Sequence, residues 1–297
     1  MFIRLSLATI ILICAIALNG CKHDTPVPAP VPKEIVWTTL LDSSLSHWDK
    51  WIGVPHYSVD LPGYPKGDGM NGTPIGLNND PLSVYKIEAV DGKPYLHISG
   101  QIYGGLTTKK EYENYHLKLE FKWGEKKYEP RLNAKRDNGI LYHCYGPHGK
   151  FWNVWMNSQE FQIQEADMGD YYALGPLMDI KAARRLQDNE DAWIYEPTDS
   201  LRIFGDDGVA GRCRRGKDYE KPHGEWNTLE LICLGDSSIH IVNGMVVMRL
   251  KNSRRKNDMG MLTTLTRGVI QIQSEGAEAW YRNIQIRQIT EVSEAYR

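Results

Sequence analysis

The stretch SSIHIVNGMVVMRL, residues 237–250, carries the clearest fold signal in the chain. Its dipeptide Asn243-Gly244 separates two runs of mainly apolar residues. Asn and Gly tolerate the positive φ angles of a two-residue type I′ turn, so this arrangement indicates a β-hairpin. The stretch therefore predicts two neighbouring antiparallel strands.

Working outward, other segments alternate apolar and polar residues, as strands with one buried face do. They are LKLEFKW (117–123), NTLELICL (227–234), GVIQIQS (268–274) and AWYRNIQIRQI (279–289). Only ALGPLMDIKAARRLQD (173–188) has a weakly helical pattern, interrupted by Gly175-Pro176. Many short strands in one domain predict an all-β fold, a two-sheet antiparallel β-sandwich or jelly roll.

The N-terminus reads as a targeting segment followed by a linker. Arg4 precedes an apolar run that ends near Leu18, too short for a spanning helix and typical of a secretory signal peptide. The sequence Leu-Asn-Gly-Cys at residues 18–21 resembles a bacterial lipobox, which predicts lipidation of Cys21 after removal of residues 1–20. Residues 21–35 are proline-rich and predict a semi-rigid tether. Residues 36–297 would then form the folded domain of a lipid-anchored protein in the bacterial cell envelope, periplasmic or surface-exposed.

Charge and cysteine content exclude several classes of protein. The formal net charge is −2, and loss of Arg4 with the leader lowers it by one, so nothing favours a nucleic-acid partner. The basic run at residues 212–217 is interpreted as a solvated loop. The cysteines left after lipidation are Cys144, Cys213 and Cys233, an odd number with spacing unlike a zinc site or a disulfide framework, although one disulfide stays possible.

Polar residues on the strands suggest a site for sugars. Amides and carboxylates on a sheet face offer both the donors and the acceptors that sugar hydroxyls need. Candidates for such a face are Glu120, Lys122, Tyr142 or His143, Glu160, Gln162, Gln164, Gln271 and Gln273. Trp152 and Trp155 lie just before residues 158–164 and are candidate stacking surfaces. Glu275 is a further catalytic candidate, although Ser274-Glu275-Gly276 is interpreted first as a turn, and Arg282-Asn283 is interpreted as a structural pair.

Two glutamates in SQEFQIQEADMGD (158–170) form the candidate catalytic pair. In a regular strand Glu160, Gln162 and Gln164 share one face and Glu165 points to the other. A one-residue bulge between Gln162 and Glu165 would bring both carboxylates to one face, as a glycosidase requires. Jelly-roll β-glucanases use a similar E-x-D-x-x-E strand, but here Gln162 replaces the aspartate, which disfavours ordinary double displacement.

The chain as a whole resembles the 3-keto-disaccharide hydrolase family over roughly residues 36–289. The resemblance is carried, in order, by WTTLLDSSLSHW, YGGLTTKKEYENYHLKLEFKWG, RDNGILYHCYG, SQEFQIQEADMGD, EWNTLELIC, IHIVNGMVV and GVIQIQSEGAEAWYRNIQI. It implies a fold similar to the concanavalin A-like lectins and glucanases. It also implies cleavage of glycosides whose sugar carries a ketone at C3, and a bacterial lipoprotein.

A C3 ketone acidifies the C2 proton, so a base can remove that proton and the aglycone can leave from C1, after which water adds back. This chemistry needs a base, an acid and a group that polarises the ketone. Glu160 or His143 is the expected base and Glu165 the second carboxylate, as acid or metal ligand. Lys122, Gln162, Gln273 and Trp155 are expected to bind the substrate.

Three points stay open at this stage. A divalent cation would be able to polarise the ketone, but the sequence contains no compact ligand motif. An ordinary glucanase-type glycosidase and a non-catalytic sugar-binding module on a lipid tether are the alternative functions. The aglycone and the linkage are not indicated by any motif.

Overall fold

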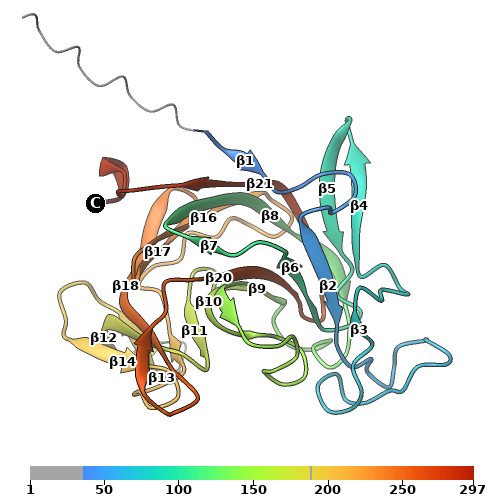
Figure 1. Ribbon diagram of the computed structural model, residues 1–297, viewed down its shortest axis with the longest axis horizontal. Coiled ribbons are helices and arrows are strands. Elements are labelled where there is room, and N and C mark those ends of the chain that lie inside the picture. Colours follow the sequence, from blue (N-terminus) through green and yellow to red (C-terminus); the bar gives the residue numbers. More distant parts are fainter. Residues whose placement is uncertain (1–35, 188) are drawn as a thin grey trace, which may run out of the picture. The chain divides into compact units, whose positions relative to one another are not determined.

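The computed structural model describes residues 36–187 and 189–297, which form two stacked antiparallel sheets. The predicted signal peptide, Cys21 and the tether lie outside the described residues. In Figure 1, β21, β8 and β16 of one sheet lie above β20, β9 and β10 of the other. The all-β, two-sheet antiparallel sandwich predicted from the alternating segments is confirmed.

The larger sheet, called the large sheet below, contains twelve of the described strands. Its main path, in spatial order, is β13 (Glu190–Tyr195), β12 (Leu177–Gln187), β18 (Met245–Lys256), β17 (Ser237–Val242), β16 (Asn227–Leu234), β8 (Tyr115–Lys127), β21 (Ala277–Gln288), β5 (Lys93–Ile98) and β4 (Tyr85–Val90). Three short strands pair with this path at its sides: β1 (Thr38–Thr39), β14 (Leu201–Phe204) and β19 (Leu262–Thr264).

The other sheet, called the small sheet, contains nine of the described strands. Its spatial order is β15 (Arg212–Cys213), β11 (Tyr171–Leu174), β10 (Asn157–Gln164), β9 (Asp137–Tyr145), β20 (Arg267–Ser274), β6 (Gly104–Thr108), β2 (Trp48–Ile52) and β3 (Gly76–Leu77), with β7 (Tyr112–Glu113) paired to β20. A 3-10 turn, η1 (Glu294–Tyr296), ends the chain. Nowhere in the described residues is there a helix long and apolar enough to cross a membrane.

The predicted hairpin is present as β17 and β18. Val242 pairs with Met245, and Asn243 and Gly244 have φ angles of 51° and 80°. Both values lie in the left-handed region that the type I′ turn uses, and Asn and Gly enter it at low cost. The Asn243 side chain also accepts a hydrogen bond from the Thr228 backbone N–H at 2.8 Å, which ties the turn to β16.

The core fills the space between the sheets because each strand alternates its apolar side chains inward. In β8, Leu117, Leu119 and Phe121 are at most 1% exposed, whereas Lys118 and Lys122 are only partly buried. Phe161 and Ile163 of β10 meet them from the small sheet in the same cluster. Burying one such side chain contributes about 1.5–3 kcal/mol, so this pattern fixes which face of each strand points outward.

The predicted helix over 173–188 is wrong, because its main segment is the strand β12. Met178, Ile180 and Ala182 alternate into a second core cluster that also contains Tyr171 and Phe204. This period-two burial outweighs the helix propensity of the alanine, arginine and leucine residues in the segment. Cys144, Cys213 and Cys233 are buried free thiols, so the possible disulfide does not form among them.

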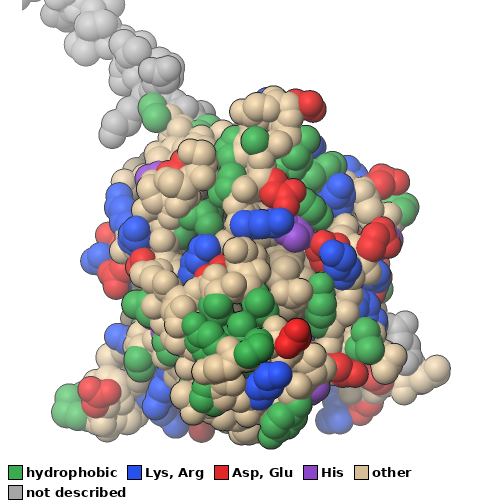
Figure 2. Space-filling view, turned by 90° about the vertical axis from the view of Figure 1, so that its right-hand side faces the viewer, with side chains coloured by type: hydrophobic (Ala, Val, Ile, Leu, Met, Phe, Trp, Pro, Cys, Tyr) green, Lys and Arg blue, Asp and Glu red, His purple; other side chains and the backbone are tan. Residues whose placement is uncertain are grey.

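Charged side chains of both signs are interspersed on the face of the domain that Figure 2 shows. This mixture agrees with the small net charge of the sequence. A single-sign surface of the kind that steers nucleic acid is not seen on this face.

Candidate functional site

The candidate site lies on the outer face of the small sheet, where polar side chains replace the apolar ones of the inner face. On β10, Phe161 and Ile163 point to the core, so Glu160, Gln162 and Gln164 point outward. The strand register aligns these with residues of neighbouring strands. The facing pairs are Glu160 with Tyr172 and Leu141, Gln162 with Gly139, Gln164 with Asp137, Asp137 with Glu275, Leu141 with Gln271, and Gln273 with Gly105.

Gly139 forms the floor of this face and makes room for two oxygen atoms. A Cβ atom placed on Gly139 would lie 2.3 Å from Glu160 Oε1 and 2.4 Å from Gln273 Oε1. The carboxyl of β10 and the amide of β20 therefore converge above the glycine of the strand between them. Any larger residue at position 139 would displace both groups.

Asp137 and Glu275 bring further carboxyl groups to the same face and share one arginine. The Nη2 of Arg131 donates to Asp137 Oδ2, and its Nη1 lies 3.3 Å from Glu275 Oε1. Gln164 Nε2 donates to Asp137 Oδ2 at 2.6 Å. We call Asp137, Glu160 and Glu275 the carboxyl cluster; all three are at most 8% exposed.

Burial raises the pKa of each carboxyl in the cluster, and the charge of Asp137 raises the pKa values of Glu160 and Glu275 further. Burial and then the charge of Asp137 raise the pKa of Glu160 well above its usual range, and the same two causes raise the pKa of Glu275. Burial also raises the pKa of Asp137, to about 6, against the opposing charge of Arg131. Carboxyl groups with pKa values moved toward neutrality suit proton transfer at physiological pH.

Two amide oxygens on this face lack partners inside the protein. Among the described residues, Gln162 Oε1 and Gln273 Oε1 are buried and make no hydrogen bond. Buried polar atoms are normally paired, so unpaired ones beside a carboxyl cluster are groups that a polar ligand would satisfy. The amide of Gln271, by contrast, already has partners inside the protein. Its Nε2 donates to Thr107 Oγ1 at 2.7 Å, and its Oε1 accepts from the Met156 N–H at 3.2 Å.

The basic run at residues 212–217 is largely a buried network, which corrects its interpretation as a solvated loop. Asp170 is fully buried and accepts hydrogen bonds from Arg212 Nε at 2.9 Å and from the Arg215 backbone N–H at 2.8 Å. Arg212 also lies over the Tyr172 ring, 5.3 Å from its centroid, and Tyr172 faces Glu160 across β10 and β11. The network thereby anchors the strand beside Glu160.

His143 was predicted as an alternative base, but it lies in the core. Between Leu141 and Cys144, β9 has two residues where β20 has only Ile270, so the bulge is in β9. His143 has a φ of 52° there, packs edge-on against Tyr115 and Tyr142, and is 1% exposed. Burial lowers its pKa to about 4, which keeps the ring neutral.

Glu165 does not join Glu160, because β10 contains no bulge between Gln162 and its end. The register runs without a shift through Gln164, and the next residue begins a turn. Glu165 instead pairs with Arg136, whose Nη1 lies 2.9 Å from its Oε1. The carboxyl groups that share the outer face with Glu160 are instead those of Asp137 and Glu275.

Lys122 and Trp155 are also not available at this face. Lys122 is on β8 of the large sheet, opposite Trp280, and lies 5.1 Å from the Trp226 ring centroid. Trp155 is 2% exposed and donates its Nε1–H to the Gly104 carbonyl at 3.1 Å. Of the predicted site residues, the structure therefore brings together Glu160, Gln162 and Gln273.

Sequence reasoning missed Asp137, Arg131 and the role of Gly139, and it ranked Glu275 as a turn residue ahead of a catalytic one. Asp137 opens β9 and Glu275 directly follows β20, positions that look like strand-end turns in the sequence. The turn interpretation is confirmed, because Glu275 and Gly276 connect β20 to β21, but Glu275 also bridges to Asp137 and its side chain is buried. The usable signal was the repeat of acidic or amide residues at every second position through Gln271, Gln273 and Glu275.

No group of three or more His, Cys, Asp or Glu side chains in the described residues is arranged to hold a metal ion. In the carboxyl cluster, Arg131 occupies the space between Asp137 and Glu275 and supplies positive charge there. The residues present thus do not form a metal site, and no step below is assigned to a metal.

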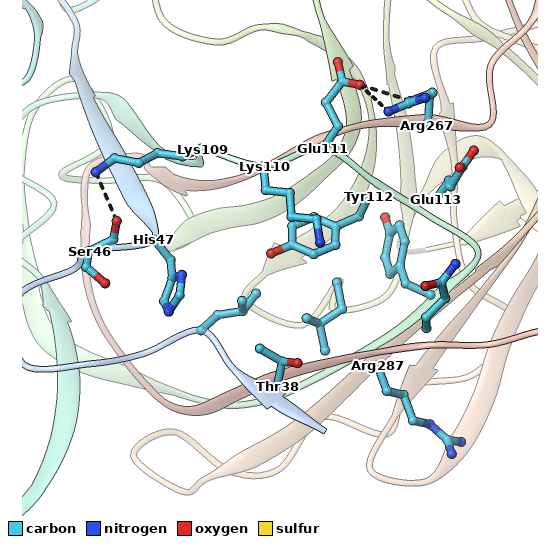
Figure 3. A pocket seen from close by; sticks show the side chains of 14 residues that line it. Thr38, Ser46, His47, Lys109, Lys110, Glu111, Tyr112, Glu113, Arg267 and Arg287 are labelled. Carbon is cyan, nitrogen blue, oxygen red and sulfur yellow. Dashed lines mark hydrogen bonds and ion pairs between the residues drawn. The ribbon is translucent and has the colours of Figure 1, made fainter. Parts of the chain in front are cut away.

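A separate hollow of about 580 Å³ lies at the sandwich edge, away from the carboxyl cluster. Figure 3 shows its lining from β1, β7, β21 and the segment before β7, with Lys110 and Tyr112 near its centre. Some of its charged side chains are engaged: Arg267 lies 3.0 Å from Glu111, and Lys109 donates to the Ser46 carbonyl at 3.0 Å. It has no buried carboxyl group with a raised pKa, so we do not take it as the reactive site.

Comparison with known proteins identifies similar structures and the family of the chain. Similar solved structures include a protein of Parabacteroides distasonis ATCC 8503 provisionally assigned as a glycosyl hydrolase, at 20% identity over 86% of this chain and 100% of that one, with a TM-score of 0.46. A Bacillus licheniformis β-glucanase follows at 10% identity, 87% and 100% coverage, and a TM-score of 0.40. The carbohydrate-binding module CBM66 of Bacillus subtilis has 7% identity, 69% and 92% coverage, and a TM-score of 0.38.

None of the curated proteins compared with the sequence matches it. The model of one domain family does match, over residues 36–287, which is nearly the whole described domain. The chain belongs to the family of 3-keto-alpha-glucoside-1,2-lyase-like domains.

Proposed function

We propose that this protein cleaves 3-keto-glycosides by removing the C2 proton and eliminating the leaving group from C1. The observation that carries the proposal is the position of the Glu160 carboxyl. It lies above Gly139 beside the unpaired Gln273 amide oxygen, and burial raises its pKa. A carboxylate of raised pKa is a stronger base, which proton removal next to a ketone requires.

In the proposed reaction, Glu160 in its ionised form takes the C2 proton. The C–H electron pair moves into the C2–C3 bond and onto the ketone oxygen, giving an enolate. Its return forms the C1=C2 double bond and breaks the bond from C1 to the leaving oxygen. Water then adds across the double bond, its oxygen to C1 and a proton to C2, and gives the free 3-keto sugar.

The other groups of the face have complementary roles in this proposal. Burial and the charge of Asp137 raise the pKa of Glu275, and in its protonated form Glu275 donates a proton to the leaving oxygen. Arg131 and the amide groups of Gln162 and Gln273 stabilise the enolate oxygen and bind hydroxyls. Gln162 stands where the glucanase pattern has an aspartate, and elimination needs no such residue.

A paired assay on the full-length protein tests the reaction. One sample contains a nitrophenyl glucoside and the other its 3-keto derivative, each with and without a chelator. Release of nitrophenol from the keto form alone is the expected result. Release from the unoxidised glucoside would contradict the elimination mechanism, and loss of activity with chelator would add a metal to the reaction.

Release from neither substrate would favour a carbohydrate-binding module as the function. Calorimetric titration with non-oxidised oligosaccharides would then be the decisive measurement. A binding module would take up such a sugar without any dependence on the ionised form of Glu160.

We also propose that the domain is lipid-anchored at Cys21 in the bacterial cell envelope, with residues 1–20 removed and 21–35 as the tether. The support is the sequence alone, a leader followed by a lipobox-like Leu-Asn-Gly-Cys. Growth with an alkyne fatty acid should label the protein and place it in the membrane fraction. Cys21→Ser should abolish both results.

A further inference from the structure

A tight turn in the connection between β9 and β10 presents a tryptophan in a conformation that tryptophan disfavours. Phe151 N–H donates to the Trp155 carbonyl at 2.8 Å, and the Val154 N–H donates to the Phe151 carbonyl at 3.0 Å. Trp152 and Asn153, the central residues, have φ angles of 54° and 59°. Two successive positive φ angles define a type I′ geometry, whose first central position normally holds Asn, Asp or Gly.

Trp152 is unfavourable at this position on two counts. A bulky residue in the left-handed region brings its Cβ close to the following carbonyl oxygen. In addition, its indole is 58% exposed, so the strain is not offset by burial in the core. Strained residues that persist in a structure cluster at ligand-binding positions.

The surrounding residues hold the turn in place. Asn153 Nδ2 donates to the Met70 carbonyl at 2.9 Å, and Trp51 Nε1 donates to the Asn153 carbonyl at 3.3 Å. Trp155 is fixed in turn by its hydrogen bond to Gly104 of β6. The Trp152 indole is therefore displayed on a rigid support.

A line of aromatic rings connects Trp152 with the carboxyl cluster. The Trp152 and Trp155 ring centroids are 6.0 Å apart, and Trp155 stacks on Tyr103 at 5.9 Å. Tyr103 directly precedes β6, whose first residue, Gly104, pairs with Ser274 next to Glu275. Trp152 thus stands at one end of this line of rings and Tyr103 at the other.

We propose that Trp152 is the stacking platform for the leaving group of the glycoside, a sugar or another ring beyond the 3-keto unit. This inference rests on the proposed function, in which the 3-keto sugar occupies the face above Gly139. Rings stack well on an exposed indole, whereas a small leaving group such as methoxide would not reach it. Trp152 then selects the substrate without taking part in proton transfer.

The test compares 3-keto-glucosides with a nitrophenyl and a methyl leaving group on the full-length protein. Trp152→Ala should raise KM for the nitrophenyl substrate about three- to ten-fold without changing kcat for that substrate. Both kcat and KM for the methyl substrate should be unchanged. Trp152→Phe should restore most of the affinity. Trp226→Ala, an aromatic deletion on the large sheet, is the matched control and should change neither KM.

Stability supplies a second readout that a structural role of the indole would not give. Trp152→Asn places a residue suited to the turn, so Tm should stay the same or rise by about 2 °C. The KM for the nitrophenyl substrate should rise as it does in the alanine variant. Equal KM changes for both substrates, or unchanged KM, would overturn the platform. A fall in Tm of Trp152→Asn together with the loss of affinity for the nitrophenyl substrate would also overturn it.

Binding separates this inference from the proposed reaction. Nitrophenyl 3-keto-glucoside is titrated into the Glu160→Gln variant and into the double variant Glu160→Gln, Trp152→Ala. The double variant should bind about three- to ten-fold more weakly, which matches the rise in KM. If the wild-type protein proves inactive but this loss appears, the reaction is refuted and the platform stands. If the wild-type protein is active but the loss is missing, the reaction stands and the platform is refuted.

Discussion

The outer faces of the two sheets both carry glutamates on alternating strand positions, yet their surroundings differ. On the large sheet, Glu120 accepts hydrogen bonds from Arg282 Nε at 2.9 Å and from Asn283. Although partial burial opposes it, these bonds lower the pKa of Glu120 overall. On the small sheet, burial and the charge of Asp137 raise the pKa of Glu160.

The contrast extends to the neighbours of each glutamate. Glu230 of the large sheet lies 2.8 Å from His116 and accepts a hydrogen bond from Tyr296 at 3.0 Å. Burial opposes these contacts but is outweighed, and the pKa of Glu230 is lowered. Paired carboxylates of this kind stabilise a sheet surface. Buried carboxyls that repel one another are a feature of reactive sites, which supports the small sheet as the proposed reactive face although the sequence patterns of the two faces look alike.

Glu160→Gln should produce the largest effect on this contrast. The amide cannot take a proton, so kcat/KM for a 3-keto-glucoside should fall about a thousand-fold or more. Because the wild-type carboxyl is buried, Tm should stay the same or rise. The matched change Glu120→Gln should leave kcat/KM intact and cost less than about 1 kcal/mol of unfolding free energy. Similar activity losses in both variants would refute the distinction.

Asp170→Asn tests how much a buried carboxylate contributes to stability when it is paired with arginines. Burial raises the pKa of Asp170, and the charges of Arg212 and Arg215 counteract that rise. Removing its charge leaves the two guanidinium groups in a buried network, so the unfolding free energy should fall by about 3 kcal/mol. Urea denaturation measures the loss. The exposed pair of Asp191 and Arg184, 2.8 Å apart, is the control, and Asp191→Asn should cost under about 0.5 kcal/mol.

Gly139→Ala tests the floor of the site. The added methyl group would lie within 2.4 Å of both Glu160 Oε1 and Gln273 Oε1, so both side chains must move. A displacement of this size should lower kcat/KM about 10- to 100-fold with little change in Tm. Gly211→Ala, where a Cβ meets nothing within 4 Å, should have no effect on activity. Full activity of the Gly139 variant would place the reaction elsewhere.

Glu220→Gln asks whether a raised pKa alone marks function. Burial raises the pKa of Glu220 from 4.5 to about 7, although Trp123 Nε1 donates to it at 3.0 Å. The folded protein therefore holds a proton that the unfolded chain has already released, so stability falls as pH rises from 4.5 to about 7. In the variant, the unfolding free energy should decrease less steeply with pH, by up to about 1.4 kcal/mol per pH unit. Denaturation at several pH values measures this slope. Its activity should be unchanged, since Glu220 is outside the carboxyl cluster.

The strands that the sequence predicted are largely those of the structure. Residues 227–234 coincide with β16, and the Asn243-Gly244 hairpin joins β17 to β18. Local patterning sufficed there because the side-chain period of a strand and the φ angles of a turn are local properties. The segment of β12 failed because its helix-forming residues are held in a strand by contacts with Tyr171 and Phe204, which are distant in sequence.

The sequence by itself determined that Glu160 and Gln162 share a strand face, because side chains alternate at every second residue. The tertiary structure decided which sheet each face belongs to, and so it placed Lys122 on the large sheet and Gln273 beside Glu160. It also decided that the bulge lies at His143 in β9, and this bulge directs the His143 side chain into the core. Finally, only packing brought Asp137 and Glu275 together with Glu160, and the pKa of each carboxyl depends on that burial and proximity, which no local pattern encodes.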